Sequence, residues 1–143
     1  MYGSQKDAKK RKELTRLLAQ RNAIVIGGHT HCLEYYDCAF PEGRITQLVV
    51  NSVWTRPELS GIEIIDSGVA EYGRRVKPEP KKKAGDTRRE NLAGYAGEFK
   101  PHVKDYFFAK AAGHYLMEVS DKSVKVDFYG GDSSKPARTF VLR

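Results

Sequence analysis

A helical pattern leads directly into a short apolar strand near the start of the chain. Leucines recur at helical spacing over residues 14–18 among Lys and Arg, which predicts an amphipathic surface helix over residues 5–21. Residues 23–26 read Ala-Ile-Val-Ile and are stopped by two glycines. A β-rich run of this length directly after a helix predicts a buried strand that is covered on both faces. The combination is typical of an α/β fold, in which loops at the carboxyl ends of strands carry functional residues.

Further short runs predict that the remainder of the chain is rich in strands. Apolar and β-branched residues between turn signals predict strands over residues 45–50, 62–65 and 69–72, a hairpin formed by 115–119 and 123–129, and a closing strand over 138–142. The expected fold class is therefore α/β and strand-rich, with one N-terminal surface helix.

Length and composition limit the classes of protein that remain. The chain has 143 residues, which is typical of one domain, so residues 1–143 are treated as a single unit. No apolar run approaches the length of a membrane-spanning helix, so no membrane segment is predicted. Two cysteines exclude a disulfide-rich scaffold. The sequence contains no G-x-S-x-G, P-loop or C-x-x-C motif, and so gives no support to serine-nucleophile or nucleotide-fold chemistry.

The positive charge of the chain lies mainly in one segment. Residues 74–89 carry eight basic and two acidic side chains, a charge of +6, which leaves +1 of the total +7 for the other 127 residues. Its prolines and dense charge predict that residues 74–100 form a basic insertion or loop. An alternative function follows, a basic module that contacts nucleic acid or an acidic partner through this segment. The candidate residues of this basic patch are Arg74, Arg75, Lys81, Lys82, Lys83, Arg88 and Arg89.

Two histidines follow the first predicted strand in the motif Gly28-His29-Thr30-His31. Histidines at i and i+2 in a loop can turn their imidazole nitrogens toward one point, and imidazole suits zinc, iron and related ions. Gly28 is expected to remove a side-chain obstacle and to permit unusual backbone angles. His29 and His31 are therefore candidate metal ligands, and Tyr35 and Tyr36 follow closely enough to line a substrate pocket.

The two cysteines beside this motif leave three interpretations open. Cys32 and Cys38 could complete a structural zinc site with His29 and His31, because zinc accepts two thiolates and two imidazoles. They could also form a disulfide in an oxidising compartment. The third interpretation is two ordinary buried or half-buried thiols.

At these residues the chain resembles the calcineurin-like metallophosphoesterases, the family that includes the purple acid phosphatases. The resemblance rests on residues 13–31, ELTRLLAQRNAIVIGGHTH, and on residues 113–131, GHYLMEVSDKSVKVDFYGG, which are similar to the family's C-terminal hairpin. It implies an αββα sandwich with two central sheets, and a hydrolase that acts on phosphate mono- or diesters. It also implies that His29 and His31 each bind one ion of a two-metal centre of divalent or mixed-valence Zn, Fe or Mn.

The other metal-binding motifs of that family are absent before Gly28. These motifs, D-x-H, G-D and G-N-H, precede G-H-x-H in the family, and the first 27 residues contain none of them. We therefore expect this chain to be the C-terminal part of a longer enzyme, inactive alone, without a tightly bound ion and prone to self-association through exposed strand edges. If the chain alone held a metal pair, further ligands would have to come from Glu34, Asp37, His102 and His114.

Overall fold

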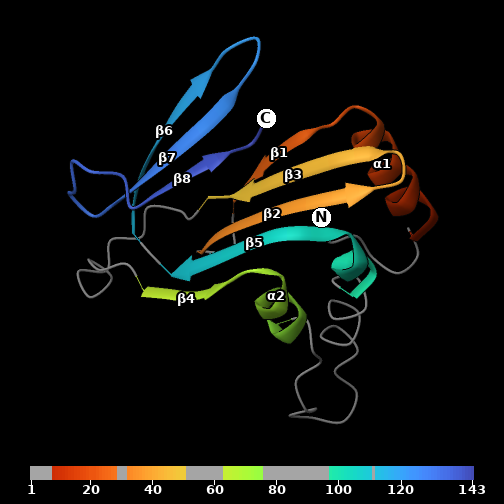
Figure 1. Ribbon diagram of the computed structural model, residues 1–143, viewed down its shortest axis with the longest axis horizontal. Coiled ribbons are helices and arrows are strands. Elements are labelled where there is room, and N and C mark those ends of the chain that lie inside the picture. Colours follow the sequence, from red (N-terminus) through yellow and green to blue (C-terminus); the bar gives the residue numbers. More distant parts are fainter. Residues whose placement is uncertain (1–7, 29–31, 51–62, 76–96, 111) are drawn as a thin grey trace.

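The computed structural model describes residues 8–28, 32–50, 63–75, 97–110 and 112–143. Two open sheets and a few short helices make up these residues, which confirms the prediction of a strand-rich α/β fold (Figure 1). No helix within these ranges is long and apolar enough to cross a membrane.

Helix α1, Ala8–Gln20, ends where the sequence predicts. Asn22 adopts the left-handed conformation with φ 47°, and its backbone N–H donates to the carbonyl oxygen of Ala19 at 2.9 Å. Asparagine tolerates this conformation and is a common residue after the last turn of a helix. Its side-chain Oδ1 also accepts a hydrogen bond from the backbone N–H of Arg44 at 3.0 Å, so the helix stop is tied to a strand far along the chain.

The buried face of α1 differs from the predicted leucine stripe. Arg11 and Ala19 are buried, whereas Leu14 and Leu17 are each 46% exposed. Positions 11, 15 and 19 share one side of a helix with 3.6 residues per turn, position 14 is turned about 100° away from the centre of that side, and position 17 lies nearly opposite it. Arg11 reaches an acid from a distant segment, because its Nη2 lies 3.4 Å from both carboxylate oxygens of Glu98. The spacing of apolar residues cannot reveal an ion pair with Glu98, which is why the buried face of α1 was predicted wrongly.

The larger sheet has five strands in the order β1-β3-β2-β5-β4. Strands β1 and β3 are parallel, and the other neighbouring pairs are antiparallel. The strands are β1 Ile24–Gly27, β2 Leu33–Phe40, β3 Gly43–Val49, β4 Glu63–Ser67 and β5 Val103–Lys110. The predicted strands over 45–50 and 62–65 correspond to β3 and β4.

Strand β1 lies at the edge of this sheet and none of its four residues is fully buried, so the prediction of a buried strand covered on both faces is wrong. Among the described residues it pairs only with β3, and Ile26 is 47% exposed. The short β2–β3 hairpin places β3 directly beside β1, which moves β1 to the periphery.

Among the described elements, strands β2 and β5, helix α2 and the short helix η3 were not predicted. Strands β2 and β5 form the middle of the sheet, and residues 69–72 belong to helix α2, Val69–Arg75, instead of a strand. Gly68 adopts φ 88° before this helix, and its carbonyl oxygen accepts from the N–H of Tyr72 at 3.3 Å. The negative charge of Glu71 in the first turn interacts favourably with the positive end of the helix dipole. Helical geometry also turns Tyr72 into the protein interior.

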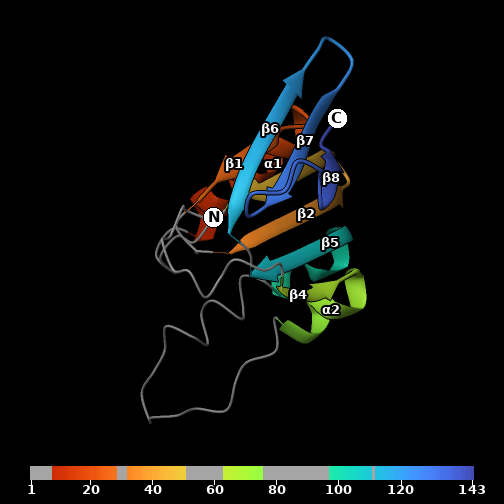
Figure 2. The ribbon, with the colours of Figure 1, turned by 90° about the vertical axis from the view of Figure 1, so that its left-hand side faces the viewer.

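The smaller sheet has the order β6-β7-β8 and confirms the predicted hairpin and closing strand. Its strands are β6 Gly113–Val119, β7 Val124–Gly130 and β8 Arg138–Val141. The turn between β6 and β7 is closed by a hydrogen bond from the N–H of Ser120 to the carbonyl oxygen of Ser123, 2.8 Å long. Figures 1 and 2 show that this turn lies away from the larger sheet.

Each face of the larger sheet packs on its own apolar cluster. The first core joins the two sheets, and its buried residues are Leu33, Tyr35, Leu48, Phe107, Ala109, Val126, Phe128, Phe140 and Leu142. The second core lies on the other face, against α2 and the short helix η3, Lys100–His102. Its buried residues are Cys38, Tyr72, Val103, Tyr106 and Phe108. The sheet is therefore an inner layer, which is why its central strands are apolar on both faces.

Replacing Gly43 by alanine is expected to destabilise the fold. Gly43 has φ 148°, and a Cβ there would overlap the backbone carbonyl of Ala19 in α1. We expect Gly43→Ala to lower the free energy of unfolding by more than about 1 kcal/mol, because both the conformation and the space suit glycine alone. Gly27→Ala is the matched control, since a Cβ there meets nothing within 4 Å. Urea denaturation measures both variants, and equal midpoints would contradict this packing.

Candidate functional site

The strand that precedes the histidine motif and the strand that follows it meet at one edge of the larger sheet, together with the ends of their neighbouring strands. Gly27 at the end of β1 pairs with Val49 at the end of β3, and Leu33 at the start of β2 pairs with Ala109 near the end of β5. We call the edge that contains these four residues the H-x-H edge. Gly28 continues from β1 at this edge, and Cys32 leads into β2 there.

His29 and His31 lie outside the described residues. Within the described ranges no group of three or more His, Cys, Asp or Glu side chains could hold a metal ion. The assignment of the two histidines as ligands stays a prediction.

Gly28 does not adopt the unusual backbone angles that the sequence suggests, and the room it leaves for the two histidines concerns residues outside the described part of the chain. Its φ is not in the left-handed region, and among described atoms a Cβ would meet only the carbonyl oxygen of Val50, at 3.6 Å, an ordinary contact. The glycine is therefore not required by its own backbone or by its described neighbours.

The structure separates the other donors that the sequence offers. The backbone of Glu34 is at the H-x-H edge, where it pairs with Val49. Asp37 lies further along β2 in an ion pair, and His102 lies at the opposite end of β2, with Nδ1 3.1 Å from the carbonyl oxygen of Ala39. His114 is on the smaller sheet, stacked on Tyr129. Of these four residues, only Glu34 belongs to the H-x-H edge.

The two cysteines are separated by an extended strand. Cys32 precedes β2 and Cys38 lies near its end, so six residues of extended chain place them about 20 Å apart. A disulfide requires Cα atoms within about 7 Å, and a shared zinc ion requires a similar closeness. Neither thiol is part of a disulfide. The disulfide and the Cys₂His₂ zinc site are therefore excluded, and the interpretation as ordinary thiols is confirmed.

Tyr35 and Tyr36 point to opposite faces of the sheet because they are neighbours in one strand. Tyr35 is buried in the first core, with its ring centroid 5.1 Å from that of Phe140. Tyr36 packs on the second core, 5.3 Å from Tyr106 and 5.8 Å from Tyr72. The structure does not bring the two rings together on one face.

Little of the basic segment belongs to the described residues. Arg74 and Arg75 are in the last turn of α2, and residues 97–102 form helical turns, so both ends of the predicted loop at 74–100 are helical. Lys81, Lys82, Lys83, Arg88 and Arg89 lie outside the described residues, and the basic-module function stays a prediction.

A charged cluster was not predicted from the sequence, and it lies on the face of the larger sheet that carries the first core. The buried carboxylate of Asp37 accepts two hydrogen bonds from Arg44, from Nε to Oδ1 at 2.5 Å and from Nη2 to Oδ2 at 2.6 Å. Asp105 lies directly opposite Asp37 on β5. Two facing carboxylates repel each other, so the guanidinium of Arg44 compensates for this pairing. The seven-residue separation of Asp37 and Arg44 around a Pro-Glu-Gly turn was the signal that could have revealed the pair.

The charges of this cluster act on its neighbours. The hydrogen bonds that Arg44 donates to Asp37 raise the pKa of Arg44. Burial is the main cause that raises the pKa of Tyr35, and the negative charges of Asp37 and Asp105 add to it. The guanidinium of Arg138 lies 5.1 Å from the ring centroid of Phe107, which adds a second cation to this face. The ion pair of Asp37 and Arg44 links β2 to β3, and the raised pKa keeps the Tyr35 hydroxyl protonated at neutral pH.

Removing Arg44 tests the structural role of this cluster. We expect Arg44→Ala to lower the free energy of unfolding by about 1–3 kcal/mol, because Asp37 keeps a buried carboxylate without its partner. Arg16→Ala is the control, since Arg16 makes a similar pair with Glu13, 2.6 Å long, on an exposed helix surface. Exposed pairs contribute little, so no measurable change is expected. Chemical denaturation that shows equal losses for the two variants would contradict the role of burial.

The two thiols are expected to differ in reactivity. Burial, with the charge of Asp37, raises the pKa of Cys38 to about 12, and the thiolate is the reactive form. At pH 8 we expect iodoacetamide to modify the half-buried Cys32 in the folded chain and to leave Cys38 intact until denaturant is added. Peptide mapping by mass spectrometry measures this order. Equal modification of both thiols in the folded chain would contradict it.

No family model, no curated protein and no solved structure matches this chain.

Proposed function

We propose that this chain contributes the last metal-binding motif of a metal-dependent phosphoesterase, with His29 and His31 as ligands of a two-metal centre. The observation that carries the proposal is the motif Gly28-His29-Thr30-His31 directly after β1. This combination of helix, strand and histidine pair is the part of the chain that resembles the calcineurin-like metallophosphoesterases.

The geometry of the H-x-H edge supports this role. Backbone hydrogen bonding between β1 and β3 extends to the end of β1, because Val50 donates its N–H to the carbonyl oxygen of Gly27 at 2.8 Å. The residue that precedes the motif is therefore fixed next to the end of β3. Strands β2 and β5 also present their ends at this edge, so side chains from separate segments could meet there, as a two-metal site requires.

The two packed sheets support the same proposal at the level of the fold. The larger and the smaller sheet share the first core, and helices α1 and α2 flank the larger sheet (Figure 1). We propose that they represent the C-terminal portion of an αββα sandwich, with β6 and β7 as the C-terminal hairpin of the family.

The chemistry is limited by the ligands that this chain supplies. When bound, two Zn, Fe or Mn ions would polarise the phosphate and activate a bridging water. His29 and His31 would each donate one imidazole nitrogen, and the carboxylate of Glu34 is the acidic group nearest in sequence whose backbone lies at the same edge. A hydrolytic centre needs more oxygen and nitrogen donors than these. We propose that the remaining ligands come from a separate segment, and that this chain alone does not hydrolyse phosphoesters.

Metal binding by the isolated chain tests the ligand assignment. We expect weak zinc binding that His29→Ala or His31→Ala lowers by at least about tenfold, since each removes one of two imidazole donors. His114→Ala is the matched control, because this histidine is exposed on the other sheet. Isothermal titration with zinc gives the affinities, and circular dichroism confirms that each variant folds.

Hydrolysis assays complete the test. We expect no zinc-, manganese- or iron-dependent turnover of an aryl phosphate or an aryl phosphodiester by this chain. Zinc affinity that is equal in the two motif variants and the control would refute the ligand assignment. Two tightly bound ions with metal-dependent turnover would show instead that the chain contains a complete ligand set.

A further inference from the structure

Strand β6 has an open edge without the features that usually protect one. Among the described strands it pairs only with β7, and the register of these seven residues runs without a bulge. It contains no lysine and no proline, the residues that commonly blunt an edge strand. Apolar side chains are exposed on both of its faces, with Leu116 51% and Val119 71% exposed.

The hydrogen bonds of the hairpin show which backbone groups face this edge. Gly131 donates its N–H to the carbonyl oxygen of Ala112 at 2.9 Å, and Ser120 donates to Ser123 at 2.8 Å. In an antiparallel pair the hydrogen-bonded residues alternate, so the even-numbered residues of β6 bond to β7. The N–H and C=O groups of Tyr115, Met117 and Val119 consequently point away from β7.

We propose that β6 pairs antiparallel with β6 of a second copy of this chain, around a two-fold axis at Leu116. The two three-stranded sheets would then form one six-stranded sheet. In this register Gly113 lies opposite Val119 of the second copy, so all seven residues overlap and the outward groups of odd-numbered residues bond to each other. A two-fold contact of this kind is closed, because it uses the β6 edge of both copies.

Hydrogen-bond complementarity between imidazole and carboxylate favours this register and a second copy as the partner. The register places His114 opposite Glu118 of the second copy, and Glu118 opposite His114 of the second copy. Both are non-hydrogen-bonded pairs, in which side chains are closest. Glu118 is the only acidic residue of β6, so the strand is complementary to its own reverse.

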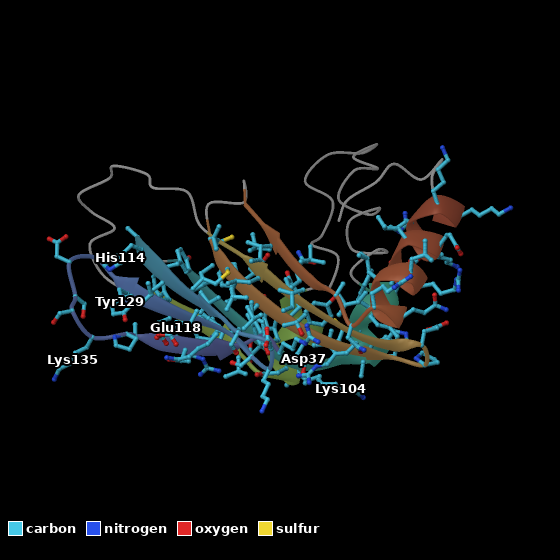
Figure 3. The ribbon with its side chains drawn as sticks, turned by 90° about the horizontal axis from the view of Figure 1, so that it is seen from above. Asp37, Lys104, His114, Glu118, Tyr129 and Lys135 are labelled. Carbon is cyan, nitrogen blue, oxygen red and sulfur yellow. The ribbon has the colours of Figure 1, made fainter. Side chains whose placement is uncertain are left out.

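The side chains of this pair are already positioned on the outer face of the smaller sheet (Figure 3). The His114 ring stacks on Tyr129, with centroids 4.9 Å apart and planes within 2°. Glu118 is held loosely, 3.9 Å from Nζ of Lys125, which lies closer to Asp127 at 2.8 Å. The carboxylate of Glu118 can therefore turn toward a second copy while Lys125 keeps its shorter contact.

The opposite face of β6 supplies apolar contacts for the same pairing. Met117 would lie opposite Tyr115 of the second copy, and sulfur–aromatic contacts of this kind are favourable. Tyr115 already packs on Phe128, with ring centroids 5.0 Å apart. The apolar row of β6 would then continue across the two-fold axis instead of ending in solvent.

The open edge of β8 provides a control surface. Leu142 donates its N–H to the carbonyl oxygen of Val124 at 2.8 Å, so the N–H of Val141 points away from β7. Val141 is also exposed, by 59%. The strand has four residues against seven in β6, which gives it fewer hydrogen bonds to offer.

Sedimentation equilibrium of the complete chain tests the proposal. A single strand pairing is smaller than a standard interface, so we expect a reversible dimer in the micromolar range. Met117→Pro removes an outward N–H and should make the chain monomeric, whereas Val141→Pro, the matched change on β8, should leave dimerisation unchanged. Circular dichroism establishes that both variants keep their strands.

A charge exchange tests the register. We expect Glu118→Lys to raise the dissociation constant by at least about tenfold, because it removes the carboxylate acceptor from both contacts with His114. Combining it with His114→Glu should restore the original affinity. A Leu116→Cys variant should also form a disulfide-linked dimer under mild oxidation, since residue 116 faces itself across the axis, and Val141→Cys should not.

Three results would overturn the proposal. These are a monomer throughout the micromolar range, a dimer that Val141→Pro weakens as much as Met117→Pro, and open-ended aggregates in place of a dimer. A double charge variant as weak as Glu118→Lys would exclude this register. None of these measurements depends on metal binding, so the proposed function and this proposal fail separately.

Discussion

The rest of the structure depends on the paired central strands β2 and β5, because each of them contributes residues to both apolar cores. Tyr35 packs in the first core, between the two sheets, and Tyr36 packs on the second core, against Tyr72 of α2. The pairing of β2 with β3 and β5 also holds together the charged cluster around Asp37. These two strands together are the common support of the smaller sheet and α2.

The sequence predicted the local elements better than their arrangement. The helix stop at Asn22, strand β3 and the hairpin of β6 and β7 follow from short-range signals, namely a left-handed residue, a β-branched run and alternation around a turn. Strand β2 was missed because Glu34 and Asp37 interrupt its apolar pattern. These charges are tolerated because Arg44, brought near by the hairpin, pairs with Asp37. Residues 69–72 are helical because a tertiary contact of Tyr72 outweighs their weak preference for a strand.

The candidate site was likewise predictable where it depends on neighbouring residues and not where it depends on the arrangement of the strands. The motif at His29 and His31 is visible in the sequence, and the end of β1 beside β3 gives it a defined starting point. Cys38 is excluded from that site because extended strand β2 separates it from Cys32. The spacing of the two cysteines in the sequence does not show that the residues between them are extended. Strand β6 is a further example, since its open edge follows from the sheet order and not from its composition.

X-ray absorption of the zinc-loaded chain tests the central claim most directly, because it reports which atoms bind the ion. Zinc–imidazole bonds are about 2.0–2.1 Å long and zinc–thiolate bonds about 2.3 Å, so the two ligand types are distinguishable. The account predicts a shell of nitrogen and oxygen donors with imidazole scattering that disappears in a His29→Ala, His31→Ala double variant. A sulfur shell, or imidazole scattering that persists in the double variant, would contradict it.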